Sequence, residues 1–334
     1  MLLSRPRRNR QSAAVRGLIR ETELTPAHLV QPLFLMPDPA ARLPIVSLPG
    51  TFRLGVDEIV REVAECVALG IRSFIMFPAV PEEHKDKRGT YATSEDNFYL
   101  HAATRLKREF PDICLISDVA LDPYSTDGHD GLVVNGKIDN DLTLPLVDAM
   151  AVAQARAGFD VIGPSEMMDG RVESIRRALD DAGHTDTAIM SYTAKYASAF
   201  YGPFRDALDS APRQLEDVPT DKKTYQMDPA NRREALREAA LDAAEGADYL
   251  MVKPAINYLD IIRELHDAHT LPIAAYHVSG ECAMLLAAAE RGWLDYQQAA
   301  SEALLSIRRA GASVIISYFA KDFAKWYGAG RKSV

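Results

Sequence analysis

The chain has 334 residues, which is long enough for one large domain or for two ordinary ones. Apolar residues make up 47% of it and charged residues 25%, a balance that excludes a largely disordered protein. The 38 Lys and Arg residues against 47 Asp and Glu residues give a formal net charge of -9, so we expect no nucleic-acid partner.

The chain begins with a short basic segment, RPRRNR at residues 5–10. A basic run at a terminus is typical either of a solvated tail or of an arm that grips a neighbouring subunit. We assign residues 1–25 to this N-terminal arm and residues 26–334 to a single catalytic domain.

That domain repeats one unit: a short apolar run rich in β-formers, then a polar loop, then a stretch of helical period. The apolar runs predict eight strands, at residues 29–36, 73–80, 113–121, 159–165, 187–194, 247–254, 272–279 and 313–320. Helices are predicted between them, for example over 56–70, 144–158, 170–183, 231–247 and 281–293. Four of these stretches reach a glycine suited to a left-handed cap, at Gly70, Gly158, Gly183 and Gly246.

Apolar strands that alternate with helices predict a parallel sheet covered by helices, and eight repeats predict its closure. The fold class is therefore α/β, as a single (β/α)8 TIM barrel with an extended N-terminal arm. An open doubly wound sheet is the alternative, but no Gly-x-Gly-x-x-Gly follows the first strand and no Walker loop is present.

Active sites of such barrels lie at the C-terminal strand ends. The residues there form a polar set: Asp118, Ser165, Lys195, Lys253, Ser279 and Tyr318. Two long loops follow the third and fifth strands, and long loops on this face are often lids. A surface loop without a function is the alternative for each.

Two lysines carry the strongest chemical signal. Lys253 ends the run GADYLMVK, so its amine is expected to emerge from a dry barrel wall, where desolvation lowers a lysine pKa. Lys195 follows the neighbouring strand, and two adjacent ammonium groups depress each other's pKa. A free amine attacks a ketone to form a Schiff base, whereas a solvent-exposed lysine at a strand end would have no such role.

The loops carry further charged residues. Arg205 and Lys222 lie in the fifth loop and suit a carboxylate, although solvated surface charge explains them equally. The third loop holds an acidic group with one histidine, which could bind a hard cation, transfer protons or form turns: Asp118, Asp122, Asp127, His129 and Asp130.

The three cysteines lie far apart and fit no close-spaced zinc or redox motif: Cys66, Cys114 and Cys282. We expect reduced thiols in a cytoplasmic protein. No apolar run reaches the ~20 residues that span a bilayer, and the first residues lack the apolar core of a secretion signal. We therefore expect no membrane partner.

Several segments in order resemble the porphobilinogen synthase family, also called 5-aminolevulinate dehydratase. They are LISDVALDPYSTDGHDG, GPSEMMDGRV, SYTAKYASAFYGPFRDA, TYQMDPANRREALRE, GADYLMVKP and AYHVSGE. The resemblance implies condensation of two 5-aminolevulinate molecules to porphobilinogen, with loss of two waters, in tetrapyrrole (haem) biosynthesis. Lys253 would bind the substrate that supplies the propionate side, and Lys195 would bind the other.

The resemblance also implies where the carboxylates bind. Ser279 and Tyr318 would hold the carboxylate of the substrate on Lys253. Arg205 and Lys222, with Gln226 nearby, would hold the carboxylate of the other substrate, from the fifth loop, which is mobile in the family.

One departure from the family concerns metal. Zinc-dependent members place three cysteines in the third loop, where this chain has Ala120, Asp122 and Asp130. Thiolates select zinc, so we expect no catalytic zinc and suggest that Asp118, Asp122 and Asp130 orient a substrate amine or water instead.

Glu238 matches the position that binds an activating Mg²⁺ in some relatives, while a surface pairing with Arg233 or with the charges beside Lys222 is the alternative. Family members form homo-octamers whose arms embrace neighbouring barrels, which favours the arm over the tail for residues 1–25. A class I aldolase with one Schiff-base lysine, and a barrel that only binds a keto acid, remain the alternative functions.

Overall fold

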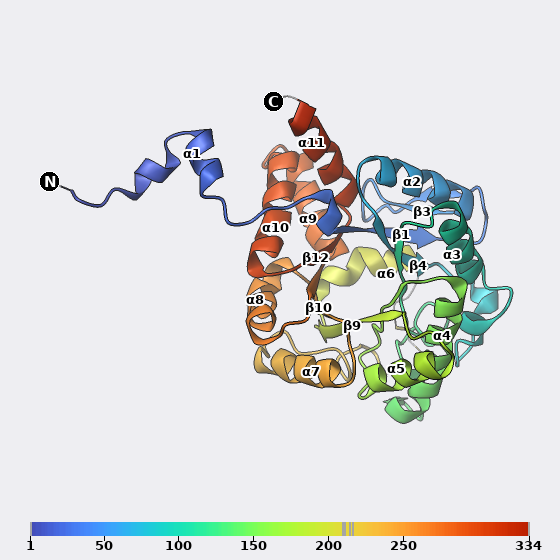
Figure 1. The fold of residues 1–334 in the computed structure, drawn as a ribbon. Helices are drawn as coiled ribbons and strands as arrows, with labels where there is room; N and C mark the ends of the chain where they lie inside the picture. Colours follow the sequence, from blue (N-terminus) through green and yellow to red (C-terminus); the bar gives the residue numbers. More distant parts are fainter. Residues whose placement is uncertain (1, 209–211, 214, 216, 333–334) are drawn as a thin grey trace.

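The computed structural model describes residues 2–208, 212, 213, 215 and 217–332 (Figure 1). Eight parallel strands form the barrel: β1 (Leu29–Leu35), β4 (Ser73–Pro78), β5 (Cys114–Ile116), β8 (Val161–Ile162), β9 (Ala188–Lys195), β10 (Tyr249–Lys253), β11 (Ile273–His277) and β12 (Val314–Ser317). Each strand pairs with the next, and β12 pairs with β1 to close the ring. The predicted (β/α)8 barrel is confirmed, and the open sheet is excluded.

The observed strands β5 and β8 are much shorter than the runs that predicted them. After Ile116 and Ile162 the two segments remain aligned through an isolated bridge between Val119 and Pro164. Gly163 lies in this stretch, where a Cβ would stand 2.5 Å from the carbonyl oxygen of Ser117. The close approach of the two backbones therefore requires glycine, and the chain leaves the regular ladder early.

Helices cover the outside of the barrel (Figure 1). They are α2 (Val56–Ala68), α3 (Phe98–Glu109), α4 (Asn140–Ala157), α5 (Arg171–Asp181), α7 (Arg233–Ala244), α8 (Leu259–Ala268), α9 (Ser279–Glu290), α10 (Tyr296–Ala310) and α11 (Ala320–Lys332). The four glycines predicted to end helices all have positive φ, between 83° and 105°. Within the described residues, none of the helices combines the length and apolar character that a bilayer-spanning segment needs.

Both long loops contain structure that the sequence did not predict. The third loop includes the hairpin β6 (Leu132–Val134) and β7 (Lys137–Asp139). Asn135 and Gly136 form its turn with φ of 48° and 77°, which suits a tight two-residue hairpin. The fifth loop begins with η5 (Ala199–Tyr201) and α6 (Gly202–Leu208).

The N-terminal segment extends away from the barrel (Figure 1). It contains η1 (Pro6–Arg10) and α1 (Ala13–Leu18), neither of which buries a residue. Leu24 is the first buried side chain of the described chain, and β1 follows shortly after it. The remaining short elements are η2 (Pro26–His28), β2 (Arg42–Pro44), β3 (Phe52–Leu54), η3 (Glu82–His84), η4 (Thr90–Thr93) and η6 (Ile256–Tyr258).

Candidate active site

The two lysines singled out from the sequence lie side by side at the C-terminal end of the barrel. Lys195 is the last residue of β9 and Lys253 is the last residue of β10, and the two are register partners. Lys195 thus belongs to its strand, whereas the sequence placed it just beyond. Each residue is 6% exposed, so both amines are almost removed from bulk water.

A β-bulge brings the two amines to the same side. The register of β9 against β10 shifts by one residue between Ser191 and Ala194. Side chains of a regular strand alternate between faces, so residues three apart face opposite sides. The extra residue reverses this alternation, and the ring of Tyr192 therefore lies within 5.9 Å of Lys195 Nζ and 5.1 Å of Lys253 Nζ.

Aromatic rings surround the amine of Lys253. Its Nζ lies 4.7 Å from the ring centroid of Tyr276, 5.0 Å from Phe204, 5.1 Å from Tyr192 and 5.2 Å from Tyr201. Among the described residues, this Nζ forms no hydrogen bond or ion pair. The amine therefore lies in a largely apolar box.

The electrostatics of Lys253 favour the neutral amine. Burial, reinforced by the positive charge of Lys195, lowers the pKa of Lys253 to about 7, against the opposing charge of Asp118. The ring faces favour the ammonium form by ~0.5–2 kcal/mol, less than the cost of desolvating the charge. A substantial share of neutral amine is therefore present near neutral pH.

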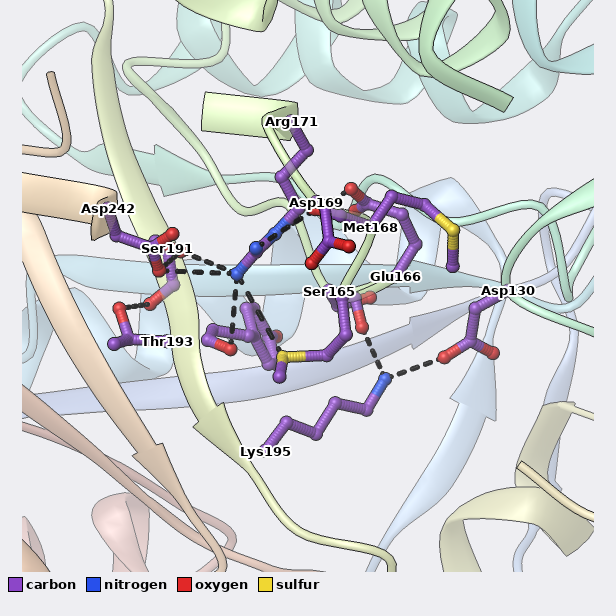
Figure 2. Close-up of polar contacts among 12 residues, drawn as sticks. Asp130, Ser165, Glu166, Met168, Asp169, Arg171, Ser191, Thr193, Lys195 and Asp242 are labelled. Atoms are coloured by element: carbon purple, nitrogen blue, oxygen red, sulfur yellow. Dashed lines mark hydrogen bonds and ion pairs between the residues drawn. The ribbon is translucent and has the colours of Figure 1, made fainter. Parts of the chain in front are cut away.

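Lys195 has a polar environment instead (Figure 2). Its Nζ donates to Asp130 Oδ2 at 2.8 Å and to the carbonyl oxygen of Ser165. The other oxygen of Asp130 accepts from Lys222, which also donates to Asp122 at 3.1 Å. Burial alone would raise the pKa of Asp130, but the charges of Lys195 and Lys222 outweigh it and hold that pKa well below its usual range.

The pKa of Asp118 is shifted in the opposite direction from that of Asp130. Burial and the nearby charge of Asp122 raise the pKa of Asp118 to about 6. Asp118 follows β5 and is 7% exposed, and its charge also acts on Lys253. One carboxyl of the third loop thus stays ionised while its neighbour exchanges a proton near neutral pH, an arrangement suited to proton transfer.

Ser279 and Tyr318 lie just after β11 and β12, whereas the sequence placed them within the ends of the predicted strands, and both take part in hydrogen bonds. Ser279, the first residue of α9, accepts through Oγ from the backbone N–H of Phe204 at 3.0 Å. The hydroxyl of Tyr318 lies 3.0 Å from that of Tyr276. Both hydroxyls are therefore tied to the aromatic box around Lys253.

The fifth loop covers this end of the barrel. Arg205 lies on α6, half-buried, with its guanidinium carbon 6.0 Å from the ring centroid of Tyr201, and no ion pair reaches it from the described residues. Gln226 is buried, and its Oε1 has no hydrogen-bond partner among the residues that the structure describes. Lys222 is buried beside Asp130, as described above. The loop therefore brings to the site a lysine paired with aspartates, an arginine without an ion pair among the described residues, and a glutamine whose oxygen is free to accept a hydrogen bond.

Glu238 lies outside the barrel, on α7. It lines a cavity of about 530 Å³ together with Glu234, Asp169 and Tyr225. Burial raises the pKa of Glu238, while the charge of Arg171 lowers it. Within the described part of the chain Glu238 forms no ion pair, so the structure shows neither the surface pairing with Arg233 nor one with the charges beside Lys222.

A buried arginine packs behind Lys195 and was not singled out from the sequence (Figure 2). Arg171 donates through Nη2 to Ser191 at 2.9 Å and to Asp242 at 3.3 Å, joining α5, β9 and α7. Its Nε lies 3.7 Å from Glu166, a fully buried carboxyl whose pKa burial raises to about 7. This network supports the wall of the barrel from which Lys195 projects.

Comparison with known proteins identifies the family. Residues 3–326 match the family described as delta-aminolevulinic acid dehydratase. The chain belongs to this family.

Its relatives within the dehydratase family match nearly the whole chain. The chloroplastic delta-aminolevulinic acid dehydratase of Physcomitrium patens is 54% identical, covering 98% of this chain and 75% of the relative. The Bradyrhizobium diazoefficiens dehydratase is 49% identical over 97% of this chain and 91% of its own. A Toxoplasma gondii dehydratase (porphobilinogen synthase), crystallised with the reaction product porphobilinogen, has 50% identity and a TM-score of 0.94, covering 97% of this chain and 92% of that one.

Sequence reasoning missed the aromatic box of this dehydratase. Tyr192 and Tyr276 lie within strands, where an apolar reading assigns them to the core. Tyr201 and Phe204 follow Lys195 closely in AFYGPF, a cluster of rings that was a usable signal. The box depends on the meeting of three separate segments, which periodicity alone does not report.

The third loop does not fit a thiolate zinc site. The three cysteines are free and lie elsewhere: Cys66, Cys114 and Cys282. Asp122 and Asp130 are engaged with lysine ammonium groups, which compete with a cation for the carboxylate oxygens. In the described residues, no group of three or more His, Cys, Asp and Glu side chains is arranged to hold a metal ion.

Proposed function

We propose that this dehydratase condenses two 5-aminolevulinate molecules into porphobilinogen, with loss of two waters, for tetrapyrrole (haem) biosynthesis. Both substrates would be held as Schiff bases, one on Lys253 and one on Lys195. The observation that carries the proposal is the register pairing of these two buried amines on β9 and β10. Family membership and the product bound to the Toxoplasma gondii relative support the same reaction.

Lys253 is proposed to hold the substrate that supplies the propionate side. Its neutral amine adds to the ketone carbon, giving a carbinolamine, and loss of water from the protonated carbinolamine gives the imine. The lowered pKa of Lys253 supports this role because only the free amine is a nucleophile. Asp118, whose pKa is raised to about 6, is suited to deliver the proton that makes water the leaving group.

Lys195 is proposed to hold the second substrate. Its Nζ donates to Asp130, so a proton must leave this amine, within the cluster, before the amine can attack the ketone. Asp130 remains ionised and then favours the cationic form of the Schiff base that results. Holding both substrates on neighbouring amines makes the coupling step intramolecular, which raises the effective concentration of the reacting atoms.

Polar side chains around the lysines are proposed to bind the two carboxylates. Ser279 and Tyr318 would hold the carboxylate of the substrate on Lys253. The Oγ of Ser279 accepts from a backbone N–H, which leaves its own hydroxyl hydrogen available to donate.

The fifth loop would hold the carboxylate of the substrate on Lys195. Arg205 has no ion pair within the described chain, and a guanidinium binds a carboxylate through two parallel hydrogen bonds. Lys222 would exchange one of its two aspartate partners for the substrate. The unsatisfied oxygen of Gln226 suits a donor such as a substrate amine.

We propose that the reaction proceeds without a catalytic zinc. The aspartates at the zinc-ligand positions of other family members support this, because Asp122 and Asp130 are paired with lysines here. We propose that Asp118, Asp122 and Asp130 orient a substrate amine or water. Full activity after treatment with a zinc-specific chelator is expected, and loss of activity that added zinc restores would contradict it.

Glu238 is proposed to bind an activating Mg²⁺ away from the lysines. Mg²⁺ keeps several waters and often takes only one or two protein carboxylates, so a cavity of about 530 Å³ lined by Glu238 and Glu234 suits the hydrated ion. Direct coordination by three acidic or histidine side chains of the described chain is not available there.

We further propose a cytoplasmic homo-oligomer, an octamer, in which residues 1–25 grip a neighbouring barrel. The exposure of apolar side chains on a segment that stands clear of the barrel supports this: Leu2, Leu3, Leu18 and Ile19 (Figure 1). The free cysteines suit a reducing compartment. Light scattering of the full chain and of a chain lacking residues 1–22 tests the assembly, and equal masses would contradict the arm's role.

The function is tested by incubating the purified chain with 5-aminolevulinate and assaying a pyrrole product. Borohydride trapping with labelled substrate is expected to mark Lys253, and Lys253→Met is expected to abolish both label and turnover at that site. A single adduct without pyrrole would favour an aldolase-like reaction. Absence of any adduct with saturable binding would favour a barrel that only binds a keto acid.

A further inference from the structure

One histidine of the third loop is bracketed by the lid, defined here as residues 219–227 of the fifth loop. His129 is fully buried, and its two ring nitrogens contact opposite ends of one lid segment. Its Nε2 lies 2.7 Å from the carbonyl oxygen of Pro219, and its Nδ1 lies 3.0 Å from the hydroxyl of Tyr225. A single imidazole thus spans the base of a seven-residue arch.

The partners of His129 define its hydrogens. A carbonyl oxygen only accepts, so Nε2 carries the proton and donates to Pro219. In the neutral imidazole Nδ1 is then an acceptor, and the hydroxyl of Tyr225 donates to it. The oxygen of Tyr225 also accepts from the backbone N–H of Asp130 at 3.3 Å. The result is an ordered chain of three hydrogen bonds between lid and loop.

The arch closed by His129 carries Lys222 near its middle. Lys222 donates to Asp122 and Asp130, and Asp130 is the residue that also accepts from Lys195. His129 directly precedes Asp130 in the chain, so hydrogen bonds from the lid to His129 also fix the position of the lid relative to Asp130. The third loop therefore holds the lid backbone through His129 and the ammonium group of Lys222 through the next residue, Asp130.

We propose that His129 is a positioning residue that latches the closed lid, through Pro219 and Tyr225, and so sets Lys222 against the Asp130–Lys195 pair. The proposal deepens the proposed function and rests on it for its kinetic consequence. Closure traps substrate beneath Lys222, so the apparent affinity for substrate falls by the factor by which the closing equilibrium weakens. Chemistry on the trapped substrate is affected less.

The test compares single substitutions at both ends of the latch. Tyr225→Phe removes one hydroxyl that makes two hydrogen bonds, and His129→Phe removes both contacts of the ring. His129→Gln retains a side-chain N–H that can reach Pro219. Tyr296→Phe is the matched control. Tyr296 lies on α10, outside the lid, and the substitution removes a part-buried hydroxyl that donates to Asp322 at 2.9 Å.

Two readouts separate a latch from a general structural role. The first is tryptic cleavage after Lys223, an exposed lid residue, under native conditions. Cleavage of a transiently open segment follows the population of the open form. The second is the division of the kinetic effect between KM and kcat for 5-aminolevulinate.

Tyr225→Phe and His129→Phe are each expected to raise the cleavage rate and KM about tenfold, which corresponds to about 1.4 kcal/mol, with kcat changed less than about threefold. His129→Gln is expected to recover part of both effects, and Tyr296→Phe to leave both unchanged. Cleavage and KM within twofold of the native chain for Tyr225→Phe and His129→Phe would overturn the latch, as would a loss confined to kcat. If the native chain formed no pyrrole, the proposed function would fail, while cleavage would still report on the latch.

Discussion

Replacing Lys195 by methionine should raise the pKa of Lys253. The charge of Lys195 is one of the causes that lower that pKa to about 7, second only to burial. Methionine keeps an unbranched apolar stem but removes the charge. Lys253 then loses a neighbouring cation while it keeps its aromatic box.

The magnitude follows from the pairing of the two residues on neighbouring strands. Adjacent strands lie ~4.8 Å apart, and two flexible side chains of this kind hold their charges ~6 Å apart. At an effective dielectric constant of about 20 the repulsion is ~3 kcal/mol, or about two pKa units as an upper figure. Asp130 adds to the shift in the same direction, because its negative charge is then balanced by Lys222 alone. We expect an increase of about one to two units.

The assay is borohydride trapping of labelled 5-aminolevulinate on Lys253 as a function of pH, read by peptide mass spectrometry. In the native chain the trapping rate should rise with pH around a midpoint near 7, because the neutral amine is the nucleophile. Lys195→Met should move this midpoint upward. Lys195→Arg keeps the charge and should leave the midpoint near 7.

An unchanged or lower midpoint in Lys195→Met would refute the electrostatic coupling of the two lysines. An upward shift of the same size in Lys195→Arg would also refute it, since the cause would then be disturbed packing. Only a shift that follows the charge supports the reasoning.

Three other changes test separate parts of the structure. Burial lowers the pKa of Lys253 below its value in the unfolded chain, so the unfolded state binds more protons between about pH 7 and 10 and stability rises with pH over that window. In denaturant unfolding at pH 7, Lys253→Met should therefore be more stable than the native chain by ~3–5 kcal/mol. This difference in unfolding free energy should vanish towards pH 10. No gain in stability at pH 7 would contradict the lowered pKa. If Mg²⁺ binds at Glu238 as proposed, it should raise the activity and the Tm of the native chain, and Glu238→Gln should abolish both responses; a retained Mg²⁺ response in the variant would remove Glu238 from the site. Gly280→Ala places a Cβ 2.4 Å from the carbonyl oxygen of Phe200, so it should displace η5 and lower kcat/KM about tenfold in steady-state assays; activity within twofold of native would contradict that close contact.

The sequence predicted the barrel because each strand is a continuous apolar run and each helix has its own period. Both signals are local in the sequence, and the structure contains the strands and helices that they predict. The strand-end residues were predicted for the same reason, since the barrel topology alone brings Lys195, Lys253, Ser279 and Tyr318 to one face.

Features that depend on contacts between distant segments were not predicted. The bulge in β9 carries no glycine, and its pattern of apolar residues reads as an uninterrupted strand. The aromatic box combines rings from β9, η5, α6 and β11. Arg171 looked like one of several helix arginines, although it is fully buried between Ser191 and Asp242. Local propensity contains no information about such partners.

The bulge in β9 also determines which residue of that strand stands beside Lys253. If β9 continued in regular register from Ser191, Ala194 would pair with Lys253 and Lys195 would face the helices. The bulge absorbs one residue, so that Lys195 pairs with Lys253 inside the barrel. Strand register is therefore as much a determinant of the proposed two-amine chemistry as the lysine itself.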